Sequence, residues 1–263
     1  MSASNPPSTP TPSTPTPAAP RRSLVAPFLA AAPVFAVLMG LGFWQVQRLA
    51  WKEGVLATID ARIHAAPTPL PPVARWPALA SDDYDYTHTS ATGRFERGAE
   101  ALIFRGSGDV NGAGSQPGYW VMVPFDPTSG GTLLVNLGFV ALDHKSDPAR
   151  AAALPEGETT VVGLLRAPED RNMFTPADNP AKGEWYTRDP QAIAAAMKLA
   201  DAAPFSLDED AHAAPAGQPA GGATVFDIPN NHAGYAVTWF GLAATLVGVL
   251  AAFTWRRARA PSS

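Results

Sequence analysis

The chain has 263 residues, a formal net charge of −4 and no cysteine. The lack of cysteine excludes disulfides, thiolate metal sites and Cys-x-x-Cys redox chemistry. A mildly acidic chain without a basic stripe is not typical of a nucleic-acid-binding protein, so we expect no nucleic-acid partner. The length suits one or two domains, but two long apolar segments must be set aside before a soluble core is counted.

Two uncharged segments are long enough to cross a lipid bilayer. Leu24–Leu41 has 18 residues and continues through Trp44, and Tyr235–Trp255 has 21. A helix needs about 20 apolar residues to span the hydrocarbon core. We therefore predict transmembrane helices over residues 24–47 and 234–255.

The basic residues beside these segments predict their orientation. Arginines flank each segment on the side toward the nearer chain terminus: Arg21 and Arg22 precede the first segment, and Arg256, Arg257 and Arg259 follow the second. The other side carries Arg48 and Lys52 next to the first segment. Because positive residues favour the cytoplasmic side, we expect both termini in the cytoplasm and residues 48–233 in the periplasm of a bacterial inner membrane.

The first segment has a second interpretation, a cleaved signal peptide. Arg21 and Arg22 resemble a twin-arginine start, but the apolar run is longer than the roughly 7–15 residues of such a peptide, and no small-x-small cleavage site follows Trp44. A retained anchor is favoured. The tail over residues 1–23 is rich in Pro, Ser, Thr and Ala and is expected to be disordered, and residues 256–263 form a short second tail.

The segment between the anchors predicts a mainly-β (α+β) domain, as a small barrel or sandwich. The first helix is expected to continue outward as far as Pro67. A later helix is expected over Pro190–Ala200, with Asp189 as its N-cap. Apolar alternation bounded by turn residues predicts strands at Tyr84–Phe95, Ala101–Phe104, Tyr119–Phe125, Thr132–Asn136, Gly138–Leu142, Thr159–Leu165 and Ala223–Ile228.

No pattern in the chain indicates catalysis. A Gly-x-Ser-x-Gly nucleophile elbow is missing from the sequence. The glycine-rich stretch from Arg105 to Gly118 lacks the Gly-Lys-Ser/Thr of a phosphate loop and is interpreted as a hairpin loop. His64, His88, His144 and His212 are far apart and lack metal-ligand spacing. We expect a protein that is not an enzyme.

His232 is the candidate ligand, because it stands where the domain meets the second apolar segment. Asn230 or Asn231 can cap a helix that starts there. His232, Tyr235 and Trp239 then fall at i, i+3 and i+7 on one face. A neutral imidazole can ligate haem iron and aromatic rings suit the macrocycle, although the ordinary alternative is that His232 is an interfacial polar group among belt residues.

Several sequence blocks together resemble the Surfeit locus protein family of cytochrome c oxidase assembly factors. The closing block, from Pro229 to His232 and on through Phe240, is the most specific. The others are Leu41–Arg48 with Trp51-Lys52, Tyr84–Tyr86, Thr92–Phe95, Gly118–Phe125, Val135–Val140, Leu164–Pro168 and Glu184–Asp189. The chain departs from the family at Leu137-Gly138-Phe139, where the usual pattern is Arg-Gly-Trp.

The resemblance implies a two-span membrane protein that acts as a chaperone in building the terminal oxidase of the respiratory chain. Its bacterial members are linked to haem a, which they deliver to or stabilise for the largest oxidase subunit. Carried over to this chain, His232 is the expected axial ligand of haem iron, and Arg48 or Lys52 could pair with the haem propionates. Implied partners are oxidase subunits, other assembly factors including the haem a synthesis machinery, and the lipid bilayer.

A different class of function fits the same chain. A scaffold that stabilises oxidase assembly intermediates without touching haem would also need a large β-rich domain without an obvious site. The two hypotheses differ in whether the purified protein carries haem.

Overall fold

The computed structural model describes most of the chain, as two compact units. One unit comprises the chain up to Trp51 and from Asn230 onward, and contains one long helix and most of another; the other unit runs from Lys52 to Pro229. The described residues are 25–106, 116–147, 150, 153–212, 214, 217–222 and 230–259. The predicted N-terminal tail, most of the glycine-rich loop and the predicted strand at Ala223–Ile228 lie outside them.

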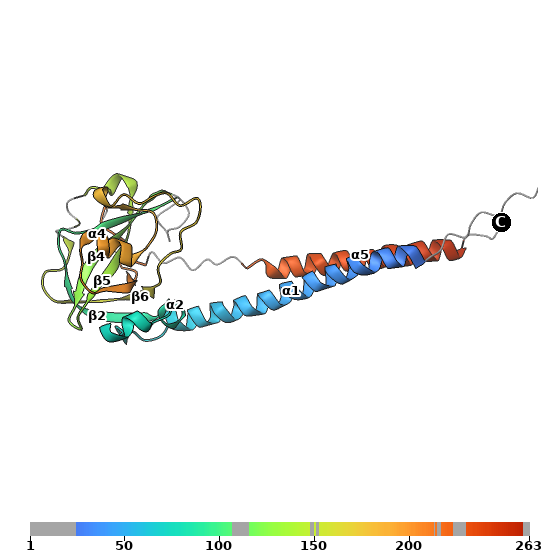
Figure 1. The fold of residues 1–263 in the computed structure, drawn as a ribbon, viewed down its shortest axis with the longest axis horizontal. Helices are drawn as coiled ribbons and strands as arrows, with labels where there is room; N and C mark the ends of the chain where they lie inside the picture. Colours follow the sequence, from blue (N-terminus) through green and yellow to red (C-terminus); the bar gives the residue numbers. More distant parts are fainter. Residues whose placement is uncertain are drawn as a thin grey trace, which may run out of the picture. The chain divides into compact units, whose positions relative to one another are not determined.

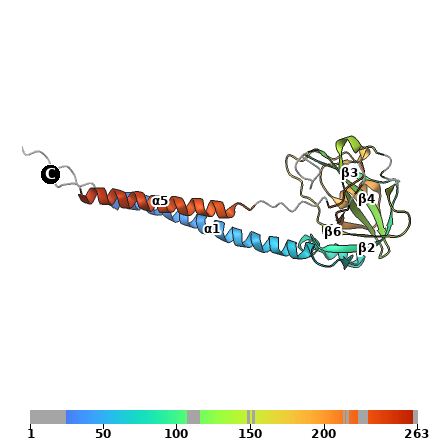
Figure 2. The same ribbon diagram turned by 180° about the vertical axis from the view of Figure 1, so that it is seen from behind.

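The two long helices are α1 (Val25–Ile63) and α5 (His232–Arg259). Both are long and apolar enough to cross a membrane, and α5 lies alongside the N-terminal part of α1 in both views (Figures 1 and 2). They contain the apolar segments on which the predicted spans rest. The limits of those spans at the membrane stay predictions.

Helix α1 extends well past its apolar part, as expected, and ends four residues before Pro67. Its last turn belongs to the second unit, where Arg62 donates to the backbone carbonyls of Asp85 at 2.9 Å and Asp82 at 2.8 Å. These two charge-assisted bonds tie the end of α1 to the start of the β-domain.

The second unit is a small closed β-barrel, which confirms the predicted fold class. Five strands close the ring in the order β2, β6, β8, β5 and β4, and β4 pairs back to β2. Strands β3 and β7 extend the sheet from β4, and β1 pairs with β2. The bounds are β1 Thr68–Pro69, β2 His88–Phe95, β3 Ala101–Arg105, β4 Gly118–Pro127, β5 Thr132–Ala141, β6 Thr159–Arg166, β7 Glu184–Trp185 and β8 Ala202–Glu209.

The short helices are set by local signals. The predicted helix is confirmed as α4 (Pro190–Met197), whose first turn donates from Ala192 to the Asp189 side chain at 3.0 Å. It ends earlier than expected because Lys198 adopts a left-handed conformation, with φ of 60°. The remaining short helices are η1 (Val73–Ala78), α2 (Ser81–Tyr84), η2 (Leu142–His144) and η3 (Pro180–Lys182).

Three hydrophobic clusters among the described residues hold the barrel together, and two of them contain the largest fully buried side chains of the strands and of α4. Phe125, Phe205 and Leu207 are fully buried in the larger cluster, formed mostly by inward-facing strand residues. On another face, Ile193 of α4 packs into a cluster with Ile103, which is also fully buried. Burial of such side chains contributes about 1.5–3 kcal/mol each, so α4 is an integral part of the barrel's core.

Three sequence predictions differ from the structure. The strand expected from Tyr84 begins at His88, because α2 occupies Ser81–Tyr84 and Tyr86 has a positive φ of 63°. The two strands predicted at Thr132–Asn136 and Gly138–Leu142 are one strand, β5. Strand β8 was not predicted, because Pro204 and the acidic Asp208 and Glu209 hide its alternation.

Gly138, which stands at the glycine of the family's Arg-Gly-Trp pattern, has a structural reason. Gly138 has φ of +121°, which side chains rarely adopt, and a Cβ there would overlap the backbone of Ala220. Phe139 and Ala220 are bridged in an antiparallel pair at this point. The close approach of a second chain segment therefore requires glycine within β5.

Candidate functional site

His232, the first residue of α5, contacts a buried glutamine of α1. The ring Nδ1 lies 2.7 Å from Oε1 of Gln45, and Gln45 is only 8% exposed. An amide oxygen accepts hydrogen bonds and cannot donate them, so the proton of the neutral imidazole is on Nδ1. Nε2 then carries a lone pair, the form in which an imidazole ligates a metal.

Small residues bring the two helices close enough for this contact. Gly42 and Gln45 are the buried residues of α1, and Ala236 and Ala243 are those of α5. A side chain at Gly42 would meet the ring of Phe240. Glycine and alanine at such an interface let helix backbones approach within the bilayer, so the sequence places Gln45 within reach of α5.

The rings of Phe43 and Phe240 pack beside Gly42. Their centroids are 5.5 Å apart, with an interplanar angle of 77°, which is the edge-to-face arrangement. A buried amide in such an apolar setting is costly unless it is hydrogen-bonded. The bond between Gln45 and His232 meets that need and also fixes the orientation of the imidazole.

The start of α5 accords with the predicted cap region. Asn231 precedes the helix, and its carbonyl accepts the first helical bond from the Tyr235 N–H at 3.2 Å. This backbone bond places Asn231 in the N-cap position. The side-chain oxygen of Asn230 is buried without a hydrogen-bond partner among the described residues, so polar groups gather immediately before His232.

The other predicted ligand-pocket residues lie on the same helices. Tyr235 is exposed and Trp239 half-buried on α5. Arg48 is exposed, and its guanidinium lies 3.9 Å from the centroid of the Trp51 ring. Lys52 opens the second unit. Their roles toward a ligand stay predictions.

Gln45 is the contact residue of the candidate site that sequence reasoning missed. It lies in a matching sequence block, directly after Trp44, but was given no role. The sequence feature that could have drawn attention to it is an amide side chain directly after the apolar part of the first helix, three residues after Gly42. Its partner is 187 positions away, so the contact could not be deduced from spacing.

The barrel contains a second polar cluster, built around Arg188. Arg188 is 2% exposed and donates to Asp208 at 2.9 and 3.1 Å and to Glu169 at 3.3 Å. Arg105 donates to both oxygens of Glu169 at 2.7 Å. Asn136 donates to Asp208 at 3.0 Å. Positive and negative groups alternate, so the cluster is internally paired.

The pKa directions of Glu169 and Arg188 favour the charged form of each side chain. Burial raises the pKa of Glu169, but the nearby Arg105 and Arg188 outweigh that effect and hold it below its usual range. Burial lowers the pKa of Arg188, but Asp208 and Glu169 outweigh it and raise the pKa further. Three arginines and three carboxylates balance here, since Arg166 also bonds Asp85 at 3.1 Å. The cluster therefore stabilises the barrel rather than attracting an anion.

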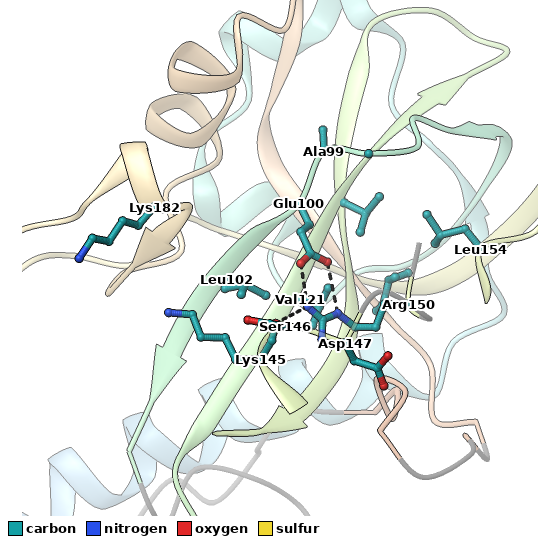
Figure 3. A pocket seen from close by; sticks show the side chains of 13 residues that line it. Ala99, Glu100, Leu102, Val121, Lys145, Ser146, Asp147, Arg150, Leu154 and Lys182 are labelled. Carbon is teal, nitrogen blue, oxygen red and sulfur yellow. Dashed lines mark hydrogen bonds and ion pairs between the residues drawn. The ribbon is translucent and has the colours of Figure 1, made fainter. Parts of the chain in front are cut away.

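A hollow of about 410 Å³ opens at another part of the barrel. Figure 3 shows Glu100 facing Arg150 there, with Nη2 2.7 Å and Nε 3.3 Å from the two carboxylate oxygens. Lys145, also on its lining, is ion-paired with Glu184. A second hollow of about 390 Å³ shares Leu137, Arg150 and Leu154 with the first. The charges of Arg150 and Lys145 are already neutralised.

The histidines outside α5 do not form a metal site. Within the described part of the chain, no group of three or more His, Cys, Asp or Glu side chains is placed to hold a metal ion. His88 is instead half-buried between two acceptors, the Ala65 carbonyl at 2.8 Å and Asp210 at 2.9 Å. These two contacts hold the His88 ring within the barrel domain.

Comparison with known proteins covers both helices and the barrel. The model of the SURF1 family matches residues 32–244. The chain belongs to the SURF1 family. That match includes both Gln45 and His232, so the helix contact lies within the part of the chain that the family shares.

Individual relatives each match most of the chain. Surfeit locus protein 1 of Mus musculus is 34% identical over 227 residues, covering 82% of this chain and 71% of the relative. The Homo sapiens protein of the same name is 33% identical, covering 82% and 73%. A SURF1-like protein of Monosiga brevicollis is 33% identical and covers 82% of both chains.

Proposed function

We propose that this protein is an assembly factor for a haem-copper cytochrome c oxidase, and that it binds haem a as cargo for the largest subunit. The carrying observation is the hydrogen bond between His232 and Gln45. It leaves Nε2 of the imidazole as the lone-pair nitrogen at the start of α5. Membership of the SURF1 family supports the wider role in assembly.

The residues of the helix pair suit such a cargo. His232 would ligate the iron, and Gln45 would act as the outer partner that orients a ligating imidazole in metal sites. Tyr235 and Trp239 would lie beside the macrocycle, and Arg48 and Lys52 would pair with its propionates. Bound haem supplies iron that needs a nitrogen ligand, and the protein supplies a fixed tautomer and an apolar surrounding.

The proposal includes a location. The two apolar helices support a protein anchored in the membrane, and the arginines at the chain ends favour cytoplasmic termini in a bacterial inner membrane. The barrel would then be periplasmic. Its partners would be oxidase subunits and other assembly factors, including the haem a synthesis machinery.

The test is the haem content of the full chain purified in detergent from cells that also make haem a. We expect haem in the wild-type protein and at least about a tenfold loss in His232→Ala, because a ligand bond is removed. His64→Ala is the matched control, since the His64 side chain is 75% exposed and bonds within α1. Equal haem in His232→Ala and the wild type would contradict the ligand role.

A scaffold that never touches haem is the second candidate. The observation that favours it is a pair of exposed apolar side chains on the barrel domain, Met173 and Phe174, because such groups mark protein contacts. Co-purification of oxidase subunits with a haem-free wild-type protein would support the scaffold over the haem carrier.

A further inference from the structure

Two large apolar side chains project into solvent from one tight turn of the barrel domain. Met173 is 89% exposed and Phe174 is 83% exposed. They are the central residues of a turn closed by the Thr175 N–H, which donates to the Asn172 carbonyl at 3.0 Å. Among the large apolar side chains described in this domain, the next most exposed is Leu142, at 48%.

Side-chain hydrogen bonds hold this turn, which we call the Met-Phe turn (Asn172–Thr175), in one conformation. The Asn172 side-chain oxygen accepts from the Phe174 N–H at 2.8 Å, and the Thr175 hydroxyl accepts from the Asn172 N–H at 3.0 Å. This Asx arrangement fixes the backbone from within. A partner would therefore meet both side chains on a preformed backbone, which lowers the entropy cost of binding.

The segment that carries the turn is anchored on both sides. Before it, the Glu169 N–H donates to the Arg188 carbonyl at 2.8 Å. After it, Asp178 accepts from the Tyr186 N–H at 2.8 Å. Arg171 ties the two sides together, since it bonds Asp178 and donates to the Thr187 hydroxyl at 3.1 Å. The exposure of the Met-Phe turn is thus built into a hydrogen-bonded frame.

The surface beside the turn has the composition of a protein-binding site. Phe174 borders a hollow of about 280 Å³, lined also by Phe104, Pro176 and Tyr186. A larger polar hollow adjoins it, sharing Tyr186 and including Arg105. Aromatic residues, methionine and arginine are enriched at the centres of protein interfaces, where a few of them dominate the affinity.

Charge favours a protein over a lipid surface as the partner. Segments that bind anionic bilayers present unpaired lysine or arginine beside their apolar groups. Residues 169–178 contain three carboxylates and one arginine, and that Arg171 is ion-paired with Asp178. Because its one arginine is already paired, this segment offers no free positive charge to anionic headgroups, whereas its exposed apolar pair is compatible with an apolar pocket on a protein.

We infer that the Met-Phe turn docks Met173 and Phe174 into an apolar pocket on the oxidase subunit that this protein assists. The inference rests on the proposed function for the identity of the partner. It assigns subunit recognition to the barrel domain and leaves haem binding to the helix pair. The two activities are therefore separable by mutation.

The experiment measures both activities in one preparation. The full chain and the largest oxidase subunit, carrying different tags, are produced in cells that make haem a. Subunit and haem are then quantified per chain after purification. The double variant Met173→Ser with Phe174→Ser is expected to reduce the co-purified subunit at least about tenfold, as expected for loss of central interface residues, with haem content unchanged. Leu142→Ser is the matched control and is expected to match the wild type.

The outcomes distinguish the two proposals. Subunit recovery from the double variant within twofold of the wild type overturns the docking role of the turn. A wild-type chain that carries haem but recovers no subunit also overturns it, and leaves the haem proposal standing. A wild-type chain that recovers the subunit without haem, and loses it in the double variant, supports docking and contradicts the haem role.

A cross-linking measurement covers the case in which the double variant folds poorly. A photoreactive benzophenone residue replaces Phe174, which is largely exposed and so is not needed for the core, and position 142 serves as the control site. Cross-links from position 174 to the oxidase subunit support the inference. Cross-links to lipid alone, or to a second copy of this chain alone, overturn it in favour of the bilayer or of self-association.

Discussion

In the barrel, Arg188 shares its guanidinium between Asp208 and Glu169, and Asn136 adds a further donor to Asp208. In the helix pair, the buried Gln45 and the half-buried His232 are joined by one hydrogen bond of 2.7 Å. Buried charges that are each paired with several opposite charges make a site rigid. The single contact of the helix pair leaves a ring nitrogen available. The barrel's polar groups are paired with one another and serve stability, whereas we propose a binding role for those of the helix pair.

The largest effect is expected from Asp208→Ala, which tests whether the paired polar groups of the barrel stabilise its fold. The variant leaves the guanidinium of Arg188 buried with one of its two carboxylate partners removed. Loss of one partner in a buried ion pair costs about 3–5 kcal/mol, so the free energy of unfolding should fall by about that amount. Urea unfolding of the full chain in detergent, followed by tryptophan fluorescence, measures it.

The control for Asp208→Ala is an exposed ion pair on the same barrel. Glu156 is 87% exposed in its pair with Arg97, and exposed pairs contribute little because water already screens them. Glu156→Gln is expected to leave the urea midpoint unchanged. Equal loss in both variants would mean that burial of the network is not what stabilises the barrel.

Substituting a glycine in the barrel and one in the helix pair compares the same two regions, with a smaller expected change in stability. Gly138→Ala in β5 forces an alanine into φ of +121° and against the backbone of Ala220, which should destabilise the barrel by about 1–3 kcal/mol. Gly40→Ala in α1 meets nothing within 4 Å and should be neutral or slightly favourable, since alanine is the better helix former. The melting temperatures of both variants, compared with the wild type, measure these effects. A Gly138→Ala protein as stable as Gly40→Ala would contradict the close approach.

The smallest expected effect is a pH dependence from His88. Burial lowers the pKa of His88, but the bonds to the Ala65 carbonyl and to Asp210 outweigh it and raise the pKa. The charged form therefore stabilises the folded barrel below about pH 6.5, the ordinary value for histidine, and this contribution is lost as the pH rises through the raised pKa. Unfolding midpoints across that range should fall less in His88→Gln than in the wild type. An identical pH profile for both proteins would show that the contact between His88 and Asp210 does not contribute to the pH dependence of stability.

Much of the fold follows from local sequence signals, whereas the sites depend on distant contacts. The N-cap at Asp189 and the apolar run of α5 are encoded within a few residues, so both helices were predictable. Closure of the barrel by β2 on β4, by contrast, is a pairing that alternation cannot reveal. Strand β8 was missed because Asp208 is a buried charge with partners from distant elements.

The candidate site shows the same division. The sequence identified His232 by its place before an apolar helix, and the resemblance strengthened that choice. Gln45 came into view with the structure, because the two residues meet through the packing of two helices from opposite ends of the chain. The exposure of Met173 and Phe174 could not be predicted either, because the sequence of an apolar pair in a loop does not show whether the pair is buried or exposed.

The most direct test of the account is the visible absorption spectrum of the full chain purified from cells that make haem a. The account predicts a bound-haem spectrum in the wild type that is lost in His232→Ala. Gln45→Leu should weaken haem binding by about 10–100-fold, the usual effect of removing the partner of a ligating imidazole. A haem spectrum that is the same in the wild type, His232→Ala and Gln45→Leu would contradict the central claim.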